Sequence, residues 1–120
     1  MNQFDLKSRT ALITGGAQGF GFDIAKKFLN SGANVIIWDI DEKELQNAVK
    51  KINNSKLSYN VVDVSNFEKI NQTVLVINKK TNIDILINNA GITGPTAELW
   101  NYSINDWNKV IEINLNGYFN

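Results

Sequence analysis

The sequence contains no cysteine, no histidine and only one proline among its 120 residues. Without cysteine the chain has no disulfide and no thiolate chemistry, and without histidine it lacks the commonest metal ligand and general base. Zinc sites and Ser-His-Asp triads are therefore excluded within the chain, and no metal site is predicted. Any proton transfer here falls to tyrosine, lysine or carboxylates, or to residues outside this sequence.

Charge of one sign and long apolar runs are also missing. Twelve basic and twelve acidic side chains cancel to a formal net charge of zero, which argues against nucleic acid as a partner because a phosphate-binding surface needs clustered positive charge. The apolar runs are only a few residues long, and residues 1–10 lack the basic and apolar regions of an export signal. We therefore expect a cytoplasmic protein with no membrane partner.

What the sequence does contain is a regular alternation of short apolar runs with amphipathic stretches. The run over residues 34–38 shows no polar alternation, which is typical of strands covered on both faces, as in parallel sheets. We expect strands over residues 10–14, 34–38, 57–62 and 83–87. We expect helices over residues 22–31 and 41–52, a third helix capped by Ser65 with Glu68, and a fourth capped by Ser103 with Asp106.

This alternation predicts an α/β fold, a Rossmann-type doubly wound parallel sheet with helices on both faces and right-handed crossovers. In that order the fourth strand lies beside the first, and ligands bind at the switch point between them. No linker, repeat or low-complexity tract divides residues 1–120, which are interpreted as the N-terminal part of a single dinucleotide-binding Rossmann domain. Residues 117–120 carry no helix stop signal, so we expect a domain truncated after about four βα units.

The turn after the first expected strand is rich in glycine, and residues 14–21 read Thr-Gly-Gly-Ala-Gln-Gly-Phe-Gly. The first N–H groups of a helix have no partners and the helix dipole adds positive charge, so a pyrophosphate can bind there. By analogy with dinucleotide folds, Gly15 permits the tight turn, Gly19 lets backbone approach the phosphates, and Gly21 lets the helix pack near the strand. The spacing differs from the general dinucleotide fingerprint and from the P-loop, and such a turn alone could serve strand-to-helix geometry only.

Asp39 lies eighteen residues after Gly21, at the end of the second expected strand. Dinucleotide folds place there the acidic residue that hydrogen-bonds the adenosine ribose hydroxyls. A carboxylate repels a 2′-phosphate, and neither residues 15–21 nor residues 35–42 include an arginine or lysine to attract one. The sequence therefore predicts NAD, preferred over NADP, as the cofactor. The alternative is that Asp39 is a solvated acid of the following turn.

Two motifs together resemble the compact branch of the short-chain dehydrogenase/reductase family. They are Thr-Gly-x-x-x-Gly-x-Gly at Thr14–Gly21 and Asn-Asn-Ala-Gly at Asn88–Gly91, each after an expected strand. The resemblance implies an NAD(P)-dependent oxidoreductase that transfers hydride between nicotinamide and an alcohol or carbonyl substrate, such as a 3-oxoacyl thioester or a sugar or polyol. It also implies a homo-oligomer at full length.

The resemblance implies roles for further residues. In the glycine turn Gln18 belongs to the predicted cofactor site, and Phe20 stands where the family usually has Ile or Leu and contacts the pyrophosphate mainly through its backbone. Asp63, followed by Val64, matches the position that contacts the adenine ring. The segment that lines the nicotinamide-ribose side comprises Asn89, Ala90 and Gly91.

Asn114 is polar on an otherwise apolar helix face. Trp107, Val110, Ile111 and Leu115 share that face, so we expect a buried stripe in which the amide needs hydrogen-bond partners. The position resembles the family's catalytic-tetrad asparagine, whose backbone holds a water in the proton relay. The alternative is a structural or helix-kinking asparagine.

The rest of the family's catalytic set, a serine and Tyr-x-x-x-Lys, is not found in these residues. None of Tyr59, Tyr102 and Tyr118 is followed four residues later by lysine. We expect the 120 residues alone to be inactive. A second function class therefore stays open, a non-catalytic dinucleotide-binding module.

Overall fold

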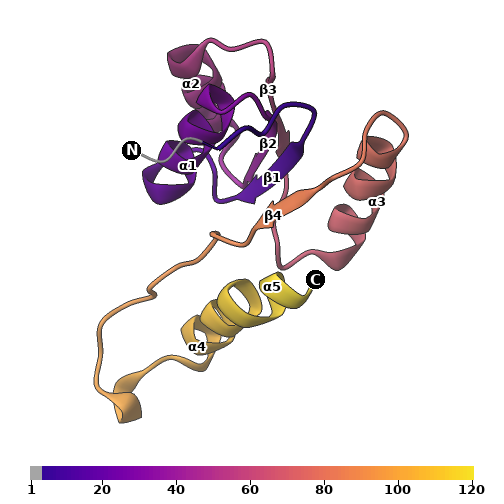
Figure 1. Cartoon of the computed structure of the whole chain (residues 1–120). Coiled ribbons are helices and arrows are strands. Elements are labelled where there is room, and N and C mark those ends of the chain that lie inside the picture. The colour runs from indigo at the N-terminus through magenta and orange to yellow at the C-terminus, as the bar shows by residue number, and fades with distance from the viewer. Residues whose placement is uncertain (1–3) are drawn as a thin grey trace.

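The computed structural model describes residues 4–120 and is built around four parallel strands in the order β3-β2-β1-β4 (Figure 1). The strands are β1 (Thr10–Thr14), β2 (Asn34–Asp39), β3 (Leu57–Val61) and β4 (Ile85–Ile87). The helices between them are α1 (Gly19–Asn30), α2 (Glu42–Ile52) and α3 (Phe67–Asn78). After β4 come the 3-10 turn η1 (Leu99–Asn101), α4 (Ile104–Ile111), the π-helical turn η2 (Glu112–Asn116) and α5 (Gly117–Phe119).

The pairing of the strands confirms the predicted doubly wound parallel sheet. Thr10 of β1 pairs with Asn34 of β2, Val35 of β2 pairs with Leu57 of β3, and Ala11 pairs with Ile85 of β4. The fourth strand therefore lies beside the first, as predicted. The switch point between β1 and its two neighbours is where such folds form a ligand crevice.

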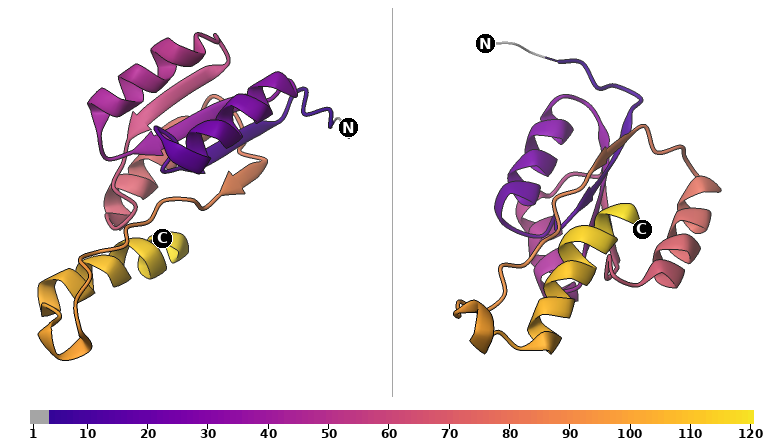
Figure 2. Two further views of the ribbon diagram at one scale, coloured as in Figure 1. Left: turned by 90° about the vertical axis from the view of Figure 1, so that its left-hand side faces the viewer. Right: turned by 90° about the horizontal axis from the view of Figure 1, so that it is seen from below.

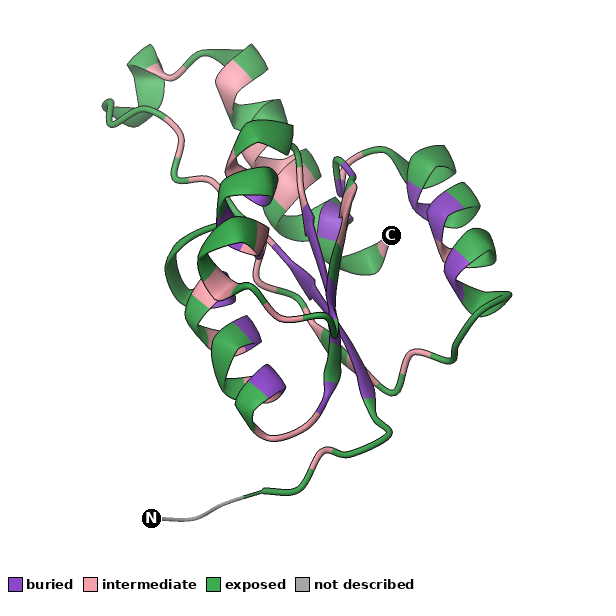
Figure 3. Ribbon diagram, turned by 90° about the horizontal axis from the view of Figure 1, so that it is seen from above, coloured by how far each residue is buried: buried purple, intermediate pink, exposed green. Residues whose placement is uncertain are grey.

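Helices cover both faces of the sheet (Figures 2 and 3). Successive residues of the central strands belong to different cores. On one face Ile13 and Ile37 pack against the buried residues of α1 and α2, among them Ala25 and Leu45. The other core lies under α3 and includes, from the sheet outward, Leu12, Ile36, Trp38, Ile70 and Ile77. This double coverage explains why β1 and β2 lack polar alternation.

Capping explains where three helices begin. Asp41 accepts a hydrogen bond from the Glu44 backbone N–H at 3.1 Å, and Ser103 accepts one from Asp106 N–H at 3.4 Å, which confirms both predicted caps. The predicted Ser65 cap is wrong. Asn66 caps α3 instead, accepting from Lys69 N–H at 3.1 Å, because the Ser65 hydroxyl donates to Asp63.

The last helical segment differs most from the prediction. Of residues 104–119, all of which the structure describes, only Gly117 is buried, while Trp107 and Leu115 are 52% and 62% exposed. The predicted buried stripe is therefore wrong, because the apolar face finds little described chain to pack against. Trp107 contacts Tyr102 edge-to-face, with ring centroids 6.4 Å apart. Within residues 4–120 no helix combines the length and apolarity needed to cross a bilayer.

The core under α1 and α2 makes a direct stability test possible. Ile37 is fully buried in it, so Ile37→Ala should lower the free energy of unfolding of the intact protein by about 2–5 kcal/mol through lost contacts and a residual cavity. Ile104→Ala is the matched control, because Ile104 is exposed, and it should change the value by less than about 0.5 kcal/mol. Equal losses in denaturant titrations would contradict the burial described.

Candidate dinucleotide site

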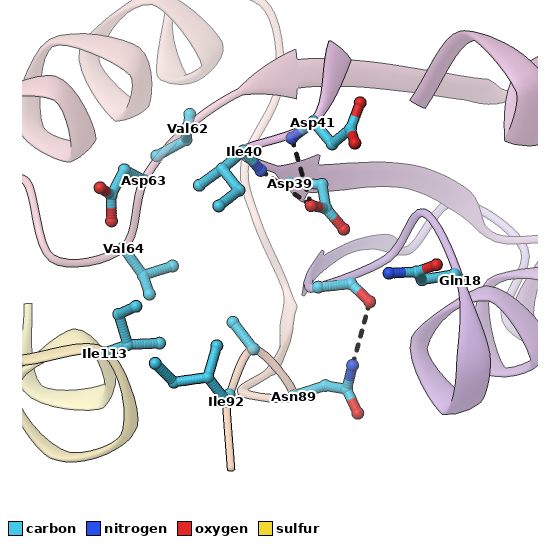
Figure 4. Close-up of a pocket in the computed structure, with 13 residues that line it drawn as sticks. Gln18, Asp39, Ile40, Asp41, Val62, Asp63, Val64, Asn89, Ile92 and Ile113 are labelled. Carbon is cyan, nitrogen blue, oxygen red and sulfur yellow. Dashed lines mark hydrogen bonds between the residues drawn. The ribbon is translucent and has the colours of Figure 1, made fainter. Parts of the chain in front are cut away.

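The carboxyl ends of the strands and the chain after β4 surround a cavity of about 390 Å³ (Figure 4). Eight residues predicted for cofactor binding line it, namely Gly15, Gln18, Asp39, Asp63, Val64, Asn89, Ala90 and Gly91. The other lining residues were missed by the sequence analysis, namely Ile40, Asp41, Val62, Ile92 and Ile113. Most of the missed residues are apolar and directly follow a strand or a predicted site residue, which is the signal that could have found them.

The hydroxyl of Thr14 joins the two sequence motifs. Its oxygen accepts hydrogen bonds from the backbone N–H groups of Asn89 and Ala90, both at 3.0 Å, and it donates to the Ile87 carbonyl at 3.4 Å. The Asn89 side chain donates in return to the Gly15 carbonyl at 3.1 Å, as the dashed line in Figure 4 shows. The glycine turn and the segment after β4 therefore hold each other in place.

Two of the glycines are required for conformation or close packing. Gly15 has φ +63°, in the left-handed region that disfavours other residues. Gly21 is buried, and a Cβ there would lie 2.7 Å from Nδ2 of Asn89 and would collide with the carbonyl of Gly15. These observations agree with the tight turn and the close helix packing predicted for Gly15 and Gly21.

Gly19 differs from these two because it faces open space. Its φ is +61°, yet a Cβ built on it meets no protein atom within 4 Å. The left-handed φ favours glycine here as it does at Gly15, and the open space leaves the Gly19 backbone accessible to a ligand. The ring of Phe20 is 83% exposed, and Phe20 does not line the cavity.

The N-terminus of α1 lacks a side-chain cap. Among the described residues, Asp41, Asn66 and Ser103 cap α2, α3 and α4, but Gln18 at the start of α1 makes no capping hydrogen bond through its side chain. The first turn of α1 also contains no acidic residue. An anion can therefore satisfy the first N–H groups and the positive end of the helix dipole.

Three carboxylates lie on the cavity wall beyond the glycine turn. Asp39 is half-buried and accepts from Ile40 N–H at 2.8 Å and, more weakly, from Ala17 N–H at 3.4 Å, so it links β2 to the glycine turn. Asp41 caps α2, and Asp63 accepts from Ser65 N–H at 2.9 Å. None of the described residues that line the cavity is an arginine or a lysine.

Asn114 does not line the cavity but supports a residue that does. Its Oδ1 accepts from Ile92 N–H at 2.8 Å, and its Nδ2 donates to the Ile92 carbonyl at 2.7 Å. The amide thus has the dedicated partners that were expected, although Asn114 is exposed and not buried as predicted. It lies within the π-helical turn η2, a kind of turn that occurs often at functional sites.

Fold and site together define a Rossmann-type domain of the nucleotide-binding class. Comparison with protein families matches residues 9–120 to the model described as short chain dehydrogenase. The chain therefore belongs to the short-chain dehydrogenase family, as the two motifs predicted.

Individual relatives agree with this family. The chain is 38% identical over 119 residues to the 3-oxoacyl-[acyl-carrier-protein] reductase FabG of Chlamydia muridarum, a match that covers 96% of this chain and 48% of the relative. Among solved structures, it resembles a 3-ketoacyl-(acyl-carrier-protein) reductase from Brucella melitensis complexed with NADH, with TM-score 0.89, 28% identity and coverage of 96% and 48%. It also resembles a gluconate 5-dehydrogenase from Burkholderia cenocepacia in complex with NADP and tartrate, with TM-score 0.87, 30% identity and coverage of 98% and 47%. The chain thus spans about half the length of these relatives.

The Thr14 hydroxyl gives the second test. Thr14→Val keeps the shape but leaves two backbone N–H groups without their acceptor, so it should lower the free energy of unfolding by about 1–3 kcal/mol. Denaturant titration of the intact protein measures the effect. Thr96→Val, at an exposed position, is the control and should change stability little. If the Thr14 and Thr96 variants were equally stable, the hydroxyl would not hold the two motifs together.

Proposed function

We propose that the intact protein is an NAD(P)-dependent oxidoreductase that transfers hydride between the nicotinamide ring and an alcohol or carbonyl carbon. The observation that carries this proposal is the pairing of an uncapped helix N-terminus with an open Gly19 beside a cavity lined by both family motifs. These features fit a dinucleotide, in which a pyrophosphate joins two nucleosides. When bound, the nicotinamide accepts or donates the hydride.

Different residues of the chain would bind different parts of the cofactor. The N-terminus of α1, with Gln18, Gly19 and Phe20, would hold the pyrophosphate through backbone N–H groups. Asp39 would accept hydrogen bonds from the ribose hydroxyls, and Asp63 with Val64 would contact the adenine. At the other side of the cavity Asn89, Ala90 and Gly91 would line the nicotinamide ribose.

The apolar lining residues that were not predicted from the sequence add to this assignment of residues to parts of the cofactor. Ile40, Val62 and Val64 stand on the same wall as Asp39 and Asp63 and offer apolar surface suited to the flat face of a base (Figure 4). Ile113 stands beside Val64, with Ile92 next to it, and both add apolar surface to the cavity (Figure 4). Asn114, through Ile92, would position the segment on the nicotinamide side and supply the water-holding backbone of the proposed relay.

We further propose that NAD is preferred over NADP. Asp39 and Asp41 place two carboxylates where β2 ends, with no lining arginine or lysine among the described residues to offset them. A 2′-phosphate brought beside them would add like charges at short range. The relatives include one complex with NADH and one with NADP, so the preference rests on these residues and not on the family.

The cofactor preference has a direct test. Asp39→Ala in the intact protein should narrow the ratio of NADPH to NADH dissociation constants by roughly tenfold, about the effect of 1.4 kcal/mol, because one repulsive charge and one ribose acceptor are lost. Fluorescence titration of both reduced cofactors measures the ratio. Asp23→Ala is the matched control, since Asp23 is exposed on α1 and does not line the cavity. An unchanged ratio in the Asp39 variant would refute the role given to Asp39.

The substrate proposal follows the activities for which the relatives are named. A 3-oxoacyl thioester and a sugar or polyol are the two candidate substrate classes, and an oligomer of the intact protein also stays a prediction. The second candidate function, a non-catalytic dinucleotide-binding module, stays open because these 120 residues do not include Tyr-x-x-x-Lys.

Turnover separates the two functions. The intact protein should bind NADH and should consume it when a 3-oxoacyl thioester is added, or reduce NAD when a polyol is added, as followed by nicotinamide absorbance. NADH binding without turnover of either substrate class would favour the binding module. Absence of NADH binding would contradict both.

A further inference from the structure

The helical segment after β4 contacts two walls of the cavity. Asn114 bonds with both backbone groups of Ile92, which follows β4. One turn and a half further on, the side-chain amide of Asn120 donates to the carbonyl of Val64, which follows β3, at 3.1 Å. Ile113, on the same segment, lines the cavity near Val64 (Figure 4). One helix therefore touches the chain after two different strands.

The contact with Val64 is also tight. Gly117 is buried, and a Cβ built on it would lie 2.7 Å from Cγ2 and 3.2 Å from Cβ of Val64. Valine is β-branched and has few accessible side-chain rotamers, so Val64 could relieve this contact only by moving its backbone or the helix. Glycine at position 117 therefore lets the helix approach Val64 closely.

The helix face explains why these contacts coincide. Ile113, Gly117 and Asn120 are spaced by four and three residues, which places them on one side of a helix. In the π-helical turn η2 the Gly117 N–H donates to the Glu112 carbonyl, so this turn holds one residue more than an α-helical turn. The extra residue rotates the side of the helix that faces Val64 relative to the preceding face of α4. Asn114 can then turn toward Ile92 while Gly117 and Asn120 turn toward Val64.

We propose that Gly117 and Asn120 are positioning residues for the adenine wall of the dinucleotide site. They act through Val64, whose carbonyl and side chain they hold, and Val64 adjoins Asp63 on that wall. This inference rests on the proposed dinucleotide function. It predicts a loss that is confined to the adenosine half of the ligand, because Thr14 and Asn89 hold the nicotinamide side through bonds that do not involve this helix.

Two variants of the intact protein test the proposal. Asn120→Asp keeps the shape but replaces the donor by a carboxylate facing the Val64 carbonyl, and Gly117→Ala adds the Cβ that meets Val64. Each should weaken the binding of NADH and of AMP by at least about threefold, within the range expected when one hydrogen bond is lost. Binding of reduced nicotinamide mononucleotide, which lacks the adenosine half, should be unchanged. Calorimetric titration measures all three ligands.

The control is Asn116→Asp, the same chemical change one turn earlier, at an exposed side chain that does not line the cavity. It should leave AMP binding within experimental error. If Asn120→Asp does not fold, Asn120→Ala removes the donor without adding charge and carries the same expectation. Thermal unfolding of each variant separates loss of structure from loss of binding.

The outcomes distinguish this inference from the function on which it rests. Selective loss of AMP and NADH binding supports the positioning role. The positioning role is overturned if AMP binding is unchanged in the Gly117 and Asn120 variants, or if AMP and the mononucleotide lose affinity equally. In either case NADH binding by the wild-type protein still supports the dinucleotide site. Wild-type protein that binds neither NADH nor AMP overturns the site and the positioning role together.

Discussion

The arrangement of the site depends on the hydrogen bonds of one buried hydroxyl, that of Thr14. The pairing of β1 with β4 extends only to Ile13 and Ile87, so the sheet itself does not join the glycine turn to the chain after β4. The Thr14 oxygen provides that connection by accepting from Asn89 and Ala90. The return hydrogen bond from Asn89 to Gly15 fixes the glycine turn against the same segment. Both walls of the cavity near β1 are thereby set before any ligand binds, which reduces the ordering cost of binding.

The sheet and most helix positions could be predicted because their signals are local. Short, mostly apolar runs located all four strands, and Asp41 and Ser103 marked two helix starts correctly. The Ser65 cap failed because Ser65 and Asn66 are both good caps, and the choice depended on the Asp63 carboxylate, which takes the Ser65 hydroxyl. The buried stripe around Trp107 failed for another reason. Periodicity identifies an apolar face, but not what lies opposite it.

The candidate site was predictable where a motif carried it. Eight of the predicted residues line the cavity because the glycine turn, Asp39 and the segment Asn89–Gly91 stand at strand ends that a parallel sheet brings together. The apolar lining was not predictable in the same way. A position directly after a strand could have pointed to Ile40 and Val62, but Ile113 is indistinguishable in sequence from a core residue, and only the convergence of several chain segments shows that it faces a cavity. The support that Gly117 and Asn120 give to Val64 also depends on contacts between distant segments.

The uncapped start of α1 has a consequence for the abundance of the protein in a cell. No side chain caps the first N–H groups of α1, so a bound anion supplies hydrogen-bond acceptors that the chain does not. A ligand there favours the folded over the unfolded chain. Free ligand at a hundred times its dissociation constant adds about 2.7 kcal/mol to the free energy of unfolding, a sizeable part of the stability of an ordinary domain. Under the proposed function, proteolytic turnover of the chain would then follow the supply of the dinucleotide.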